Sequence, residues 1–323
     1  MYSSKNYNAR QNYCRRDFSL SRLKIYFFAT RPQFFTAIIL PVGLGAAVAW
    51  HEQRIFLLNY FLLSMLAAVF YHAGINVLND YFDYLNGADN INSTGLTPFT
   101  GGSRMIQNKI MTPKETYFLG IAFLILGSII GLYLAYERGF WLLLIGCIGL
   151  ASGYFYTAPP LFLVSRGWGE LLVGLNFGLL SVVGSYYVQT QDISITAVFA
   201  SLPLSFLIAA ILYINEFPDY DADKAVGKNH LVARLGKKNA RWGFALLVAG
   251  AYAGIIFGVI LNLLPVITLL AVIPAGLGIK AVNGLFKNYG QFKELVSSIK
   301  ATILAHLTTG ITLIVIFLFG KVY

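Results

Sequence analysis

The sequence has little charge, since only 12% of its 323 residues are Asp, Glu, Lys or Arg. A soluble domain carries about 25% charged residues, so this composition argues against a soluble protein. The two cysteines, Cys14 and Cys147, have no metal-binding or redox spacing, which excludes a disulfide framework and a cysteine metal site. The first 30 residues lack an apolar core of the kind that signal peptides need, so we expect no cleavable signal.

Apolar residues, by contrast, make up 57% of the chain and fall into long runs. A membrane-spanning helix needs about 20 mostly apolar residues. The runs therefore predict an all-α, polytopic membrane protein with nine transmembrane helices. We expect the spans at residues 33–50, 56–79, 117–136, 139–158, 169–189, 196–215, 242–262, 264–285 and 301–320.

The net charge of +10 does not indicate a nucleic-acid partner, because the basic residues lie in short gaps between the apolar runs. With the N-terminus in the cytoplasm, only Arg54, Arg138 and Lys321 of the 24 Lys and Arg residues fall on the far side. This asymmetry follows the positive-inside rule. We therefore expect a multi-pass protein of the cell membrane with a cytoplasmic N-terminus.

The chain divides into two expected parts. Residues 1–30 are a basic segment that we expect to be disordered or to lie on an anionic membrane surface. Residues 31–323 form the transmembrane domain. Its two long loops, near residues 80–116 and 216–241, fall on the cytoplasmic side, so we look for the function there.

Two of the expected spans end in an Asn followed four residues later by an Asp and then by a further Asp. These residues are Asn76, Asp80 and Asp83 after the second span, and Asn215, Asp219 and Asp223 after the sixth. Residues three or four apart share one face of a helix. Clustered carboxylates at a membrane boundary are costly unless a cation pairs with them. Oxygen ligands suit Mg²⁺, which commonly binds substrate phosphates as well.

The two acidic helix ends therefore predict a Mg²⁺–diphosphate site at the cytoplasmic face, with Asp80, Asp83, Asp219 and Asp223 as its catalytic, metal-binding residues. Solvation of ordinary helix ends is the simpler interpretation, but two matching ends favour a site. Neutralising a diphosphate makes it a better leaving group. If the departing chain is allylic, aromatic faces can stabilise the resulting cation.

Further residues near these helix ends are candidates for binding substrate. Arg104 and Lys228 follow the two acidic segments and suit phosphate oxygens, although topology alone would also place cations there. His72 lies one turn before Asn76, so it faces either substrate or the core. Arg31 either joins the site or anchors the first span. Tyr156 is a candidate partner for the cation.

The paired segments at residues 76–89 and 219–223 resemble the two Asp-rich motifs of the UbiA superfamily of intramembrane prenyltransferases. The resemblance covers nearly the whole chain. Within the superfamily the details are most similar to the MenA branch, the 1,4-dihydroxy-2-naphthoate polyprenyltransferases. The stretches that carry this likeness are Arg31-Pro32, 100–107, 156–160, 166–170 and 227–236.

The resemblance implies a Mg²⁺-dependent transfer of a polyprenyl chain from its diphosphate to an aromatic acceptor. The acceptor would be a dihydroxynaphthoate that loses CO₂, a step of menaquinone synthesis. Asn76 and Asn215 would join the aspartates around Mg²⁺ and diphosphate. The third Asp of the family's first motif would fall at Asn86 or Gly87 here, neither of which is acidic, and Asp89 takes that place as a metal ligand.

Other functions fit parts of this pattern. A related prenyltransferase could use 4-hydroxybenzoate, homogentisate, a haem or a glycerol phosphate lipid as acceptor. A cation-coupled transporter could also carry paired acidic residues, but these would be expected near the bilayer midplane, whereas Asp80 and Asp219 follow the ends of spans. The sequence leaves the chain length of the donor and the oligomeric state open.

Overall fold

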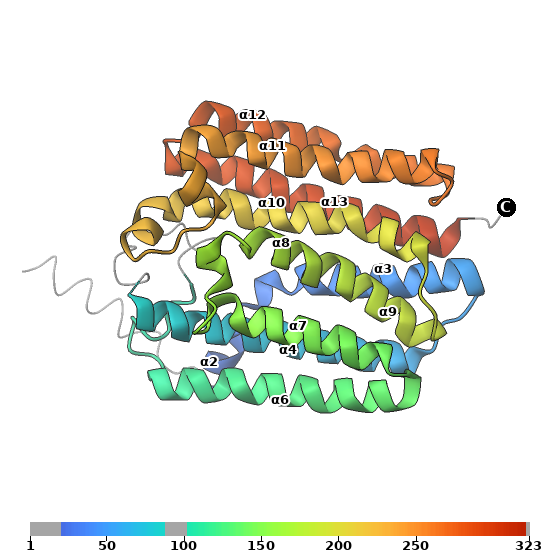
Figure 1. Cartoon of the computed structure of the whole chain (residues 1–323), viewed down its shortest axis with the longest axis horizontal. Coiled ribbons are helices and arrows are strands. Elements are labelled where there is room, and N and C mark those ends of the chain that lie inside the picture. The colour runs from blue at the N-terminus through green and yellow to red at the C-terminus, as the bar shows by residue number, and fades with distance from the viewer. Residues whose placement is uncertain (1–20, 88–101, 321–323) are drawn as a thin grey trace, which may run out of the picture.

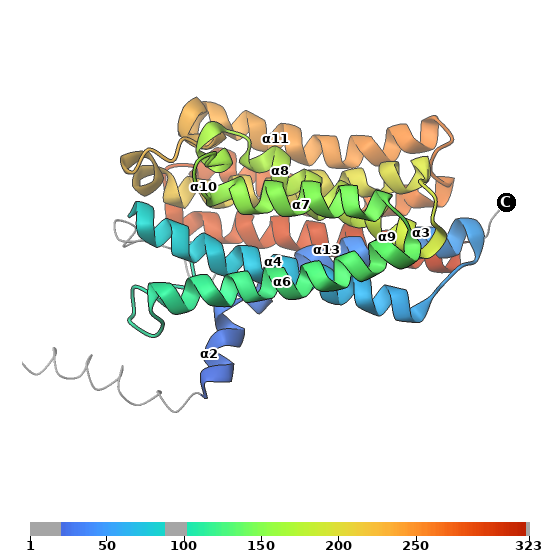
Figure 2. The same cartoon turned by 60° about the horizontal axis from the view of Figure 1, so that its bottom comes forward.

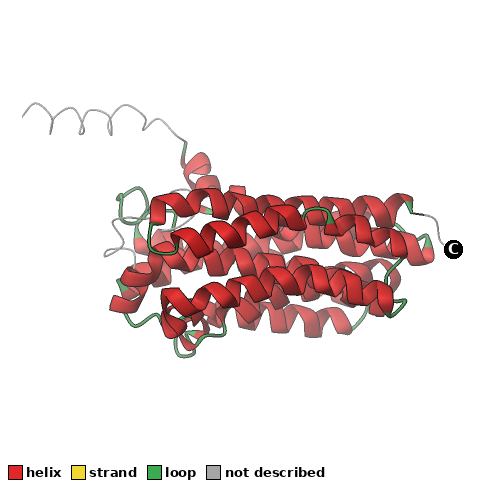
Figure 3. Cartoon of the chain, turned by 90° about the horizontal axis from the view of Figure 1, so that it is seen from above, coloured by secondary structure: helices red, strands yellow, loops and turns green. Residues whose placement is uncertain are grey.

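The computed structural model describes residues 21–87 and 102–320, and this part of the chain is helical with no strand. Figure 1 shows long helices running side by side along the molecule, and Figure 3 shows the same bundle from above without any sheet. The expected all-α class is confirmed. Of the basic segment at residues 1–30, only the part from residue 21 onward is described; Asp89 and Gly101 also lie outside the described residues.

The first half of the bundle is built from helices before residue 160. Its helices are α2 (Arg22–Ala29), α3 (Thr36–Gln53), α4 (Leu58–Asn86), α6 (Pro113–Arg138) and α7 (Trp141–Thr157). A capping box, in which Thr112 and Glu115 satisfy each other's backbone N–H groups, begins α6. Helix α2 projects from the side of the bundle (Figure 2).

The second half follows a short connection. Its helices are α8 (Gly169–Gly174), a π-helix (Leu175–Leu180), α9 (Ser181–Thr190), α10 (Ile195–Ala225), α11 (Leu231–Ile260), α12 (Ala275–Asn288) and α13 (Val296–Phe319). Short 3₁₀ segments connect or precede some of these elements, at Pro32–Phe34, Leu163–Arg166, Val266–Val272 and Phe292–Leu295.

Seven helical segments in the described chain are long and apolar enough to cross a membrane. An eighth span results if Arg22–Phe34 and Thr36–Gln53, which meet at a 62° bend, are one broken span. The remaining expected span corresponds to Trp141–Thr157, a shorter apolar helix. A multi-pass membrane fold is thus confirmed, while the count of nine spans and the cytoplasmic N-terminus stay predictions.

Two helices continue beyond the apolar runs that predict them. Helix α4 continues to Asn86, and α10 continues through Pro218 to Ala225. The hydropathy pattern marks only the apolar length of a helix, whereas backbone hydrogen bonding continues the helix into the polar region. As a result, Asp80, Asp83, Asp219 and Asp223 lie on regular helix and not in loops.

The main core lies among α3, α10, α11 and α13. Side chains such as Leu204, Phe244, Ile255 and Phe317 are fully buried there. Small residues allow close approach elsewhere: Gly45 of α3 lies against α9, where the Ser185 hydroxyl donates to the Val42 carbonyl at 2.6 Å. Such small-residue contacts are typical of membrane helix packing.

Candidate active site: two acidic helix ends at one cavity

A cavity of about 450 Å³ lies inside the bundle. Most of its wall is apolar, with residues such as Ile38, Ala67, Leu172 and Leu212. Polar side chains join it from the ends of α4 and α10 and from the segment after α10. They are Asn76, Asn79, Asp83, Asn215, Asp219, Asp223 and Lys228, together with Arg31 before α3. The cavity can therefore hold an apolar chain and a charged group at once.

Helix α4 supplies the first acidic group. Asp83 lines the cavity, and its carboxylate accepts a hydrogen bond from Asn86 at 3.2 Å. Asp80 is buried and lies beside the cavity wall, where it is ion-paired with Arg31 and accepts from the Ser103 N–H at 3.2 Å. Asn79 faces the cavity instead. Sequence reasoning missed Asn79, although helical periodicity from His72 and Asn76 places it on their face.

Helix α10 supplies the second acidic group. Asn215, Asp219 and Asp223 follow one another at intervals of about one turn, and all three line the cavity. The helix is unbroken at Pro218, so the expected common face is confirmed. The buried Asn215 Oδ1 has no hydrogen-bond partner among the described residues. An unpaired oxygen in a buried site is costly, which marks this position for a ligand.

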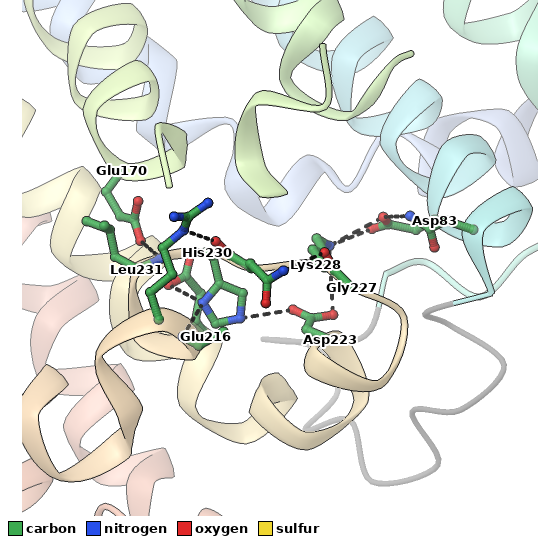
Figure 4. Close-up of polar contacts among 12 residues, drawn as sticks. Asp83, Glu170, Glu216, Asp223, Gly227, Lys228, His230 and Leu231 are labelled. Carbon is green, nitrogen blue, oxygen red and sulfur yellow. Dashed lines mark hydrogen bonds and ion pairs between the residues drawn. The ribbon is translucent and has the colours of Figure 1, made fainter. Parts of the chain in front are cut away.

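Lys228 connects the two acidic groups. Its Nζ lies 3.2 Å from Asp83 Oδ2 and 3.9 Å from Asp223 Oδ1 (Figure 4). Burial alone would lower the pKa of Lys228, but the carboxylates of Asp83 and Asp223 outweigh it and hold that pKa well above its usual value. The lysine is therefore charged, and residues far apart in the sequence meet at one cation.

Behind Asp223 lies a buried cluster that sequence reasoning missed. His230 Nε2 is 3.4 Å from Asp223 Oδ2, and its Nδ1 is 3.0 Å from Glu216 Oε2. Glu170 accepts from the Leu231 N–H at 3.2 Å at the start of α11 (Figure 4). Burial lowers the pKa of His230, but hydrogen bonds with Asp223 and Glu216 raise it to about 9. The sequence signals were the position of Glu216 directly after Asn215, and the presence of Glu170 and His230 in the stretches 166–170 and 227–236 that carry the MenA likeness.

Of the other four expected site residues, three line the cavity and one does not. His72 and Tyr156 both line the same cavity as the two acidic groups. Arg31 lines it too, in a left-handed backbone conformation with a φ of 55°. Arg104 also has a left-handed φ of 57°, but it does not line the cavity. Such conformations cost about 1–3 kcal/mol and cluster at functional sites.

A divalent cation suits these residues by its ligand chemistry. The carboxylates and carboxamides on the cavity wall offer only oxygen donors, which Mg²⁺ prefers, and Asn215 Oδ1 is available as one of them. Within residues 21–87 and 102–320, no three His, Cys, Asp or Glu side chains form a ready metal cage. Mg²⁺ at phosphate sites typically uses one or two carboxylates together with the substrate phosphates.

Comparison with known proteins defines the class to which this fold and site belong. Residues 38–294 match the model of the UbiA prenyltransferase family. The match covers most of the chain, and the chain belongs to this family of membrane prenyltransferases.

Curated relatives point to one branch of the family. The chain is 32% identical over 227 residues, 70% of its length and 71% of the relative's, to the 1,4-dihydroxy-2-naphthoate octaprenyltransferase of Bacillus subtilis. It is 28% identical over 293 residues, 90% of its length and 96% of the relative's, to the enzyme of the same name in Mycobacterium tuberculosis. The expected resemblance to the MenA branch is confirmed.

Solved structures confirm the fold. A digeranylgeranylglyceryl phosphate synthase superposes with a TM-score of 0.66 at 21% identity, covering 93% of this chain and 99% of that one. A UbiA homologue from Archaeoglobus fulgidus, bound to GPP and Mg²⁺, superposes with a TM-score of 0.60 at 18% identity, covering 90% and 99%. At these identities the likeness speaks for the fold alone.

Proposed function

We propose that this protein transfers a polyprenyl chain from polyprenyl diphosphate to 1,4-dihydroxy-2-naphthoate, with loss of CO₂, in a Mg²⁺-dependent reaction. The single observation that carries the proposal is the convergence of Asp83 and Asp223 on Lys228 at a cavity whose wall is mostly apolar. A diphosphate with an apolar tail needs both environments. The named relatives from Bacillus subtilis and Mycobacterium tuberculosis support this acceptor.

The metal ligands in this proposal are the aspartates of the two helix ends. Asp83, Asp219 and Asp223 would hold Mg²⁺ from the cavity wall, with Asp80 beside it and Asp89 from the segment after α4. Asn76 and Asn215 would bind the diphosphate and its metal. When bound, Mg²⁺ supplies charge neutralisation for the leaving diphosphate.

The cationic side chains then act on the leaving group. Lys228 and Arg31 lie on the cavity wall and would donate to phosphate oxygens as their charge grows. Arg104 would reach the diphosphate from the loop before α6. The bond from the first prenyl carbon to oxygen breaks, and its electron pair leaves with the diphosphate. An electron-rich ring carbon attacks the allylic cation, which faces Tyr156 and neighbouring rings.

The position of the cavity's acidic end supports a reaction at the cytoplasmic face of the cell membrane. In the described chain, Arg31, Arg104 and Lys228 lie near the acidic helix ends, whereas Arg54 and Arg138 lie at the opposite ends of their helices. Under the positive-inside rule, the acidic ends belong to the cytoplasmic face of the cell membrane. Both substrates would enter there or laterally from lipid.

A transfer assay with the purified full chain in vesicles tests the proposal. Geranylgeranyl diphosphate is supplied with 1,4-dihydroxy-2-naphthoate and 4-hydroxybenzoate in competition, with Mg²⁺ or with EDTA. The expected result is prenylated naphthoquinol and CO₂ that depend on Mg²⁺. Product from 4-hydroxybenzoate alone would refute the acceptor. Absence of product from aromatic acceptors would refute the proposal and favour a glycerol phosphate acceptor or a cation-coupled transporter.

A further inference from the structure

His72 is a buried histidine that the reaction described above leaves without a task. It lies on α4 with 5% of its surface exposed, and its ring lines the main cavity. Its Nδ1 has no hydrogen-bond partner among the described residues. A polar residue at this depth in a membrane helix is expensive unless a ligand or function uses it. The unpaired nitrogen therefore needs a partner that the protein itself does not supply.

Two aromatic rings hold the imidazole in place. The Phe177 ring centroid lies 4.8 Å from that of His72, and the Phe35 centroid lies 5.7 Å from it, both in edge-to-face contact. Phe177 comes from the π-helix Leu175–Leu180, where Gly178 packs against Ser205. π-Helical turns frequently occur at functional sites. Rotating the imidazole by a half-turn exchanges its nitrogen and carbon positions. Its contacts with the two phenylalanine rings allow either orientation, so a ring nitrogen can face the cavity.

The place of His72 along α4 fits an aromatic acceptor. His72, Asn76, Asn79 and Asp83 share the cavity-facing side of this helix. Three helical turns, roughly 16 Å, separate His72 from Asp83. That length accommodates a diphosphate at the acidic end, a reacting carbon within about 3–3.5 Å of the ring, and the ring itself. The hydroxyl next to the carboxyl-bearing carbon, the one that can pass an electron pair to that carbon, would then lie at His72.

We propose that His72 binds a ring hydroxyl of the aromatic acceptor and takes its proton during transfer. This inference rests on the proposed function and assigns the acceptor's place within it. The O–H bond breaks, an N–H bond forms on the imidazole, and the oxygen's electron pair moves into the ring. The carboxyl-bearing ring carbon bonds to the prenyl carbon as diphosphate departs. Loss of CO₂ returns an electron pair to the ring, and the imidazolium returns its proton to the oxygen.

The test is a thermodynamic cycle that removes the His72 side chain and one hydroxyl of the acceptor, first separately and then together. Wild type, His72→Ala and His72→Gln are each assayed with 1,4-dihydroxy-2-naphthoate and with the two naphthoates that lack one hydroxyl. The KM for geranylgeranyl diphosphate is measured alongside, to report on the diphosphate site. His306→Ala is the matched control, because this buried histidine of α13 lines a neighbouring smaller cavity and not the main one.

The expected result is a loss of about 100-fold or more in kcat/KM for the dihydroxy acceptor in His72→Ala, with little change in the KM for the prenyl donor. The preference of the wild type for the acceptor with the contacted hydroxyl should disappear in that variant. His72→Gln keeps a hydrogen-bond acceptor but no base, so it should restore acceptor KM and leave kcat low. His306→Ala should keep the wild-type preference.

Three outcomes would overturn the inference in different ways. If His72→Ala discriminates among the three naphthoates as the wild type does, His72 does not contact the hydroxyl, although the transferase activity stands. If the wild type itself prenylates none of them in the presence of Mg²⁺, the proposed function fails and the role of His72 fails with it. An equal loss with every acceptor, together with a raised donor KM, would reduce His72 to a structural residue.

Discussion

Lys228 Nζ lies 3.2 Å from Asp83 Oδ2, and so joins the segment after α10 to the end of α4. The lysine side chain is 15% exposed and the aspartate side chain 11%. An ammonium in this position neutralises carboxylates that would otherwise repel one another in a site of low dielectric. The protein thereby keeps two acidic helix ends close together before substrate and metal arrive.

Lys228→Met should make the free protein depend on Mg²⁺ for stability. Without the ammonium, Asp83 and Asp223 lose their counter-charge, and breaking a buried pair of this kind costs about 3 kcal/mol or more. Mg²⁺ bound only to the folded state should recover that loss. Thermal unfolding in detergent across a Mg²⁺ titration measures this dependence. Mg²⁺ should raise the unfolding temperature of Lys228→Met by more than it raises that of the wild type.

Lys224→Met is the matched control for this variant. Lys224 is a nearby lysine whose exposed hydrogen bond goes to Tyr220 at 3.3 Å. Its replacement should leave the Mg²⁺ response at the wild-type level. Identical Mg²⁺ shifts in all three proteins would show that Lys228 and the metal do not share the carboxylates.

Asp219→Ala should abolish transfer, whereas Asp221→Ala should retain it. Asp219 lines the cavity. Asp221, two residues later on the same helix, has a side chain 72% exposed and pairs with Lys237 at 3.0 Å. Loss of a residue that stabilises the leaving group typically lowers kcat by about 100-fold or more, while an exposed ion pair contributes about 0–1 kcal/mol to stability. Initial transfer rates at saturating substrates compare the two; equal rates would remove Asp219 from the site.

His230→Ala should raise the Mg²⁺ requirement of transfer and leave the apolar part of the cavity intact. His230 Nε2 lies 3.4 Å from Asp223 Oδ2, and His230 Nδ1 lies 3.0 Å from Glu216 Oε2. Residues that orient metal ligands typically contribute about 10-fold to 100-fold in metal affinity. The Mg²⁺ concentration at half-maximal rate should rise by about 10-fold, with partial rescue in His230→Gln.

His51→Gln controls for the loss of a buried histidine, since His51 is packed against Phe317 at the opposite end of the bundle. This variant should keep the wild-type Mg²⁺ requirement. A His230→Ala enzyme with an unchanged Mg²⁺ requirement but a lower unfolding temperature would assign His230 to folding alone.

Gly45→Ala should destabilise the bundle. A Cβ at this position would lie 2.7 Å from Ser185 Cβ and 2.9 Å from the Tyr186 nitrogen, so α3 and α9 would have to separate. Overpacking of this kind typically costs about 1–3 kcal/mol. Gly276→Ala is the control, because a Cβ there meets nothing within 4 Å. Unfolding midpoints in detergent should fall for Gly45→Ala and stay level or rise for Gly276→Ala; equal midpoints would contradict the close helix contact.

The sequence predicts the helical membrane class and most of the cavity's polar end. Apolar runs mark membrane-spanning helices, and the four-residue spacing of Asn215, Asp219 and Asp223 matches a helix face, so neither prediction needs tertiary contacts. The helix ends were harder to predict. Hydropathy ends at the polar region, and α4 and α10 continue past it.

Long-range partners could not be predicted from spacing. The sequence places Asp80 and Asp83 together, but the fold turns Asp80 toward Arg31 and leaves Asn79 on the cavity. Which of the neighbouring residues Asn79 and Asp80 faces the cavity depends on where the surrounding helices lie. The contacts of His230 with Glu216 and Asp223 likewise arise only when α11 begins beside the end of α10.

The length of α10 has a consequence for the membrane around it. Its 31 residues form a rod of roughly 46 Å, longer than the about 30 Å of a hydrocarbon core. Asp219 and Asp223 lie on the last turns of this rod, so a hydrocarbon core centred on its apolar run would leave these two cavity-lining residues level with the lipid headgroups, inside the bundle. Lipid acyl chains of different length would shift that boundary along α10. The rate of the proposed reaction would then depend on the thickness of the surrounding bilayer.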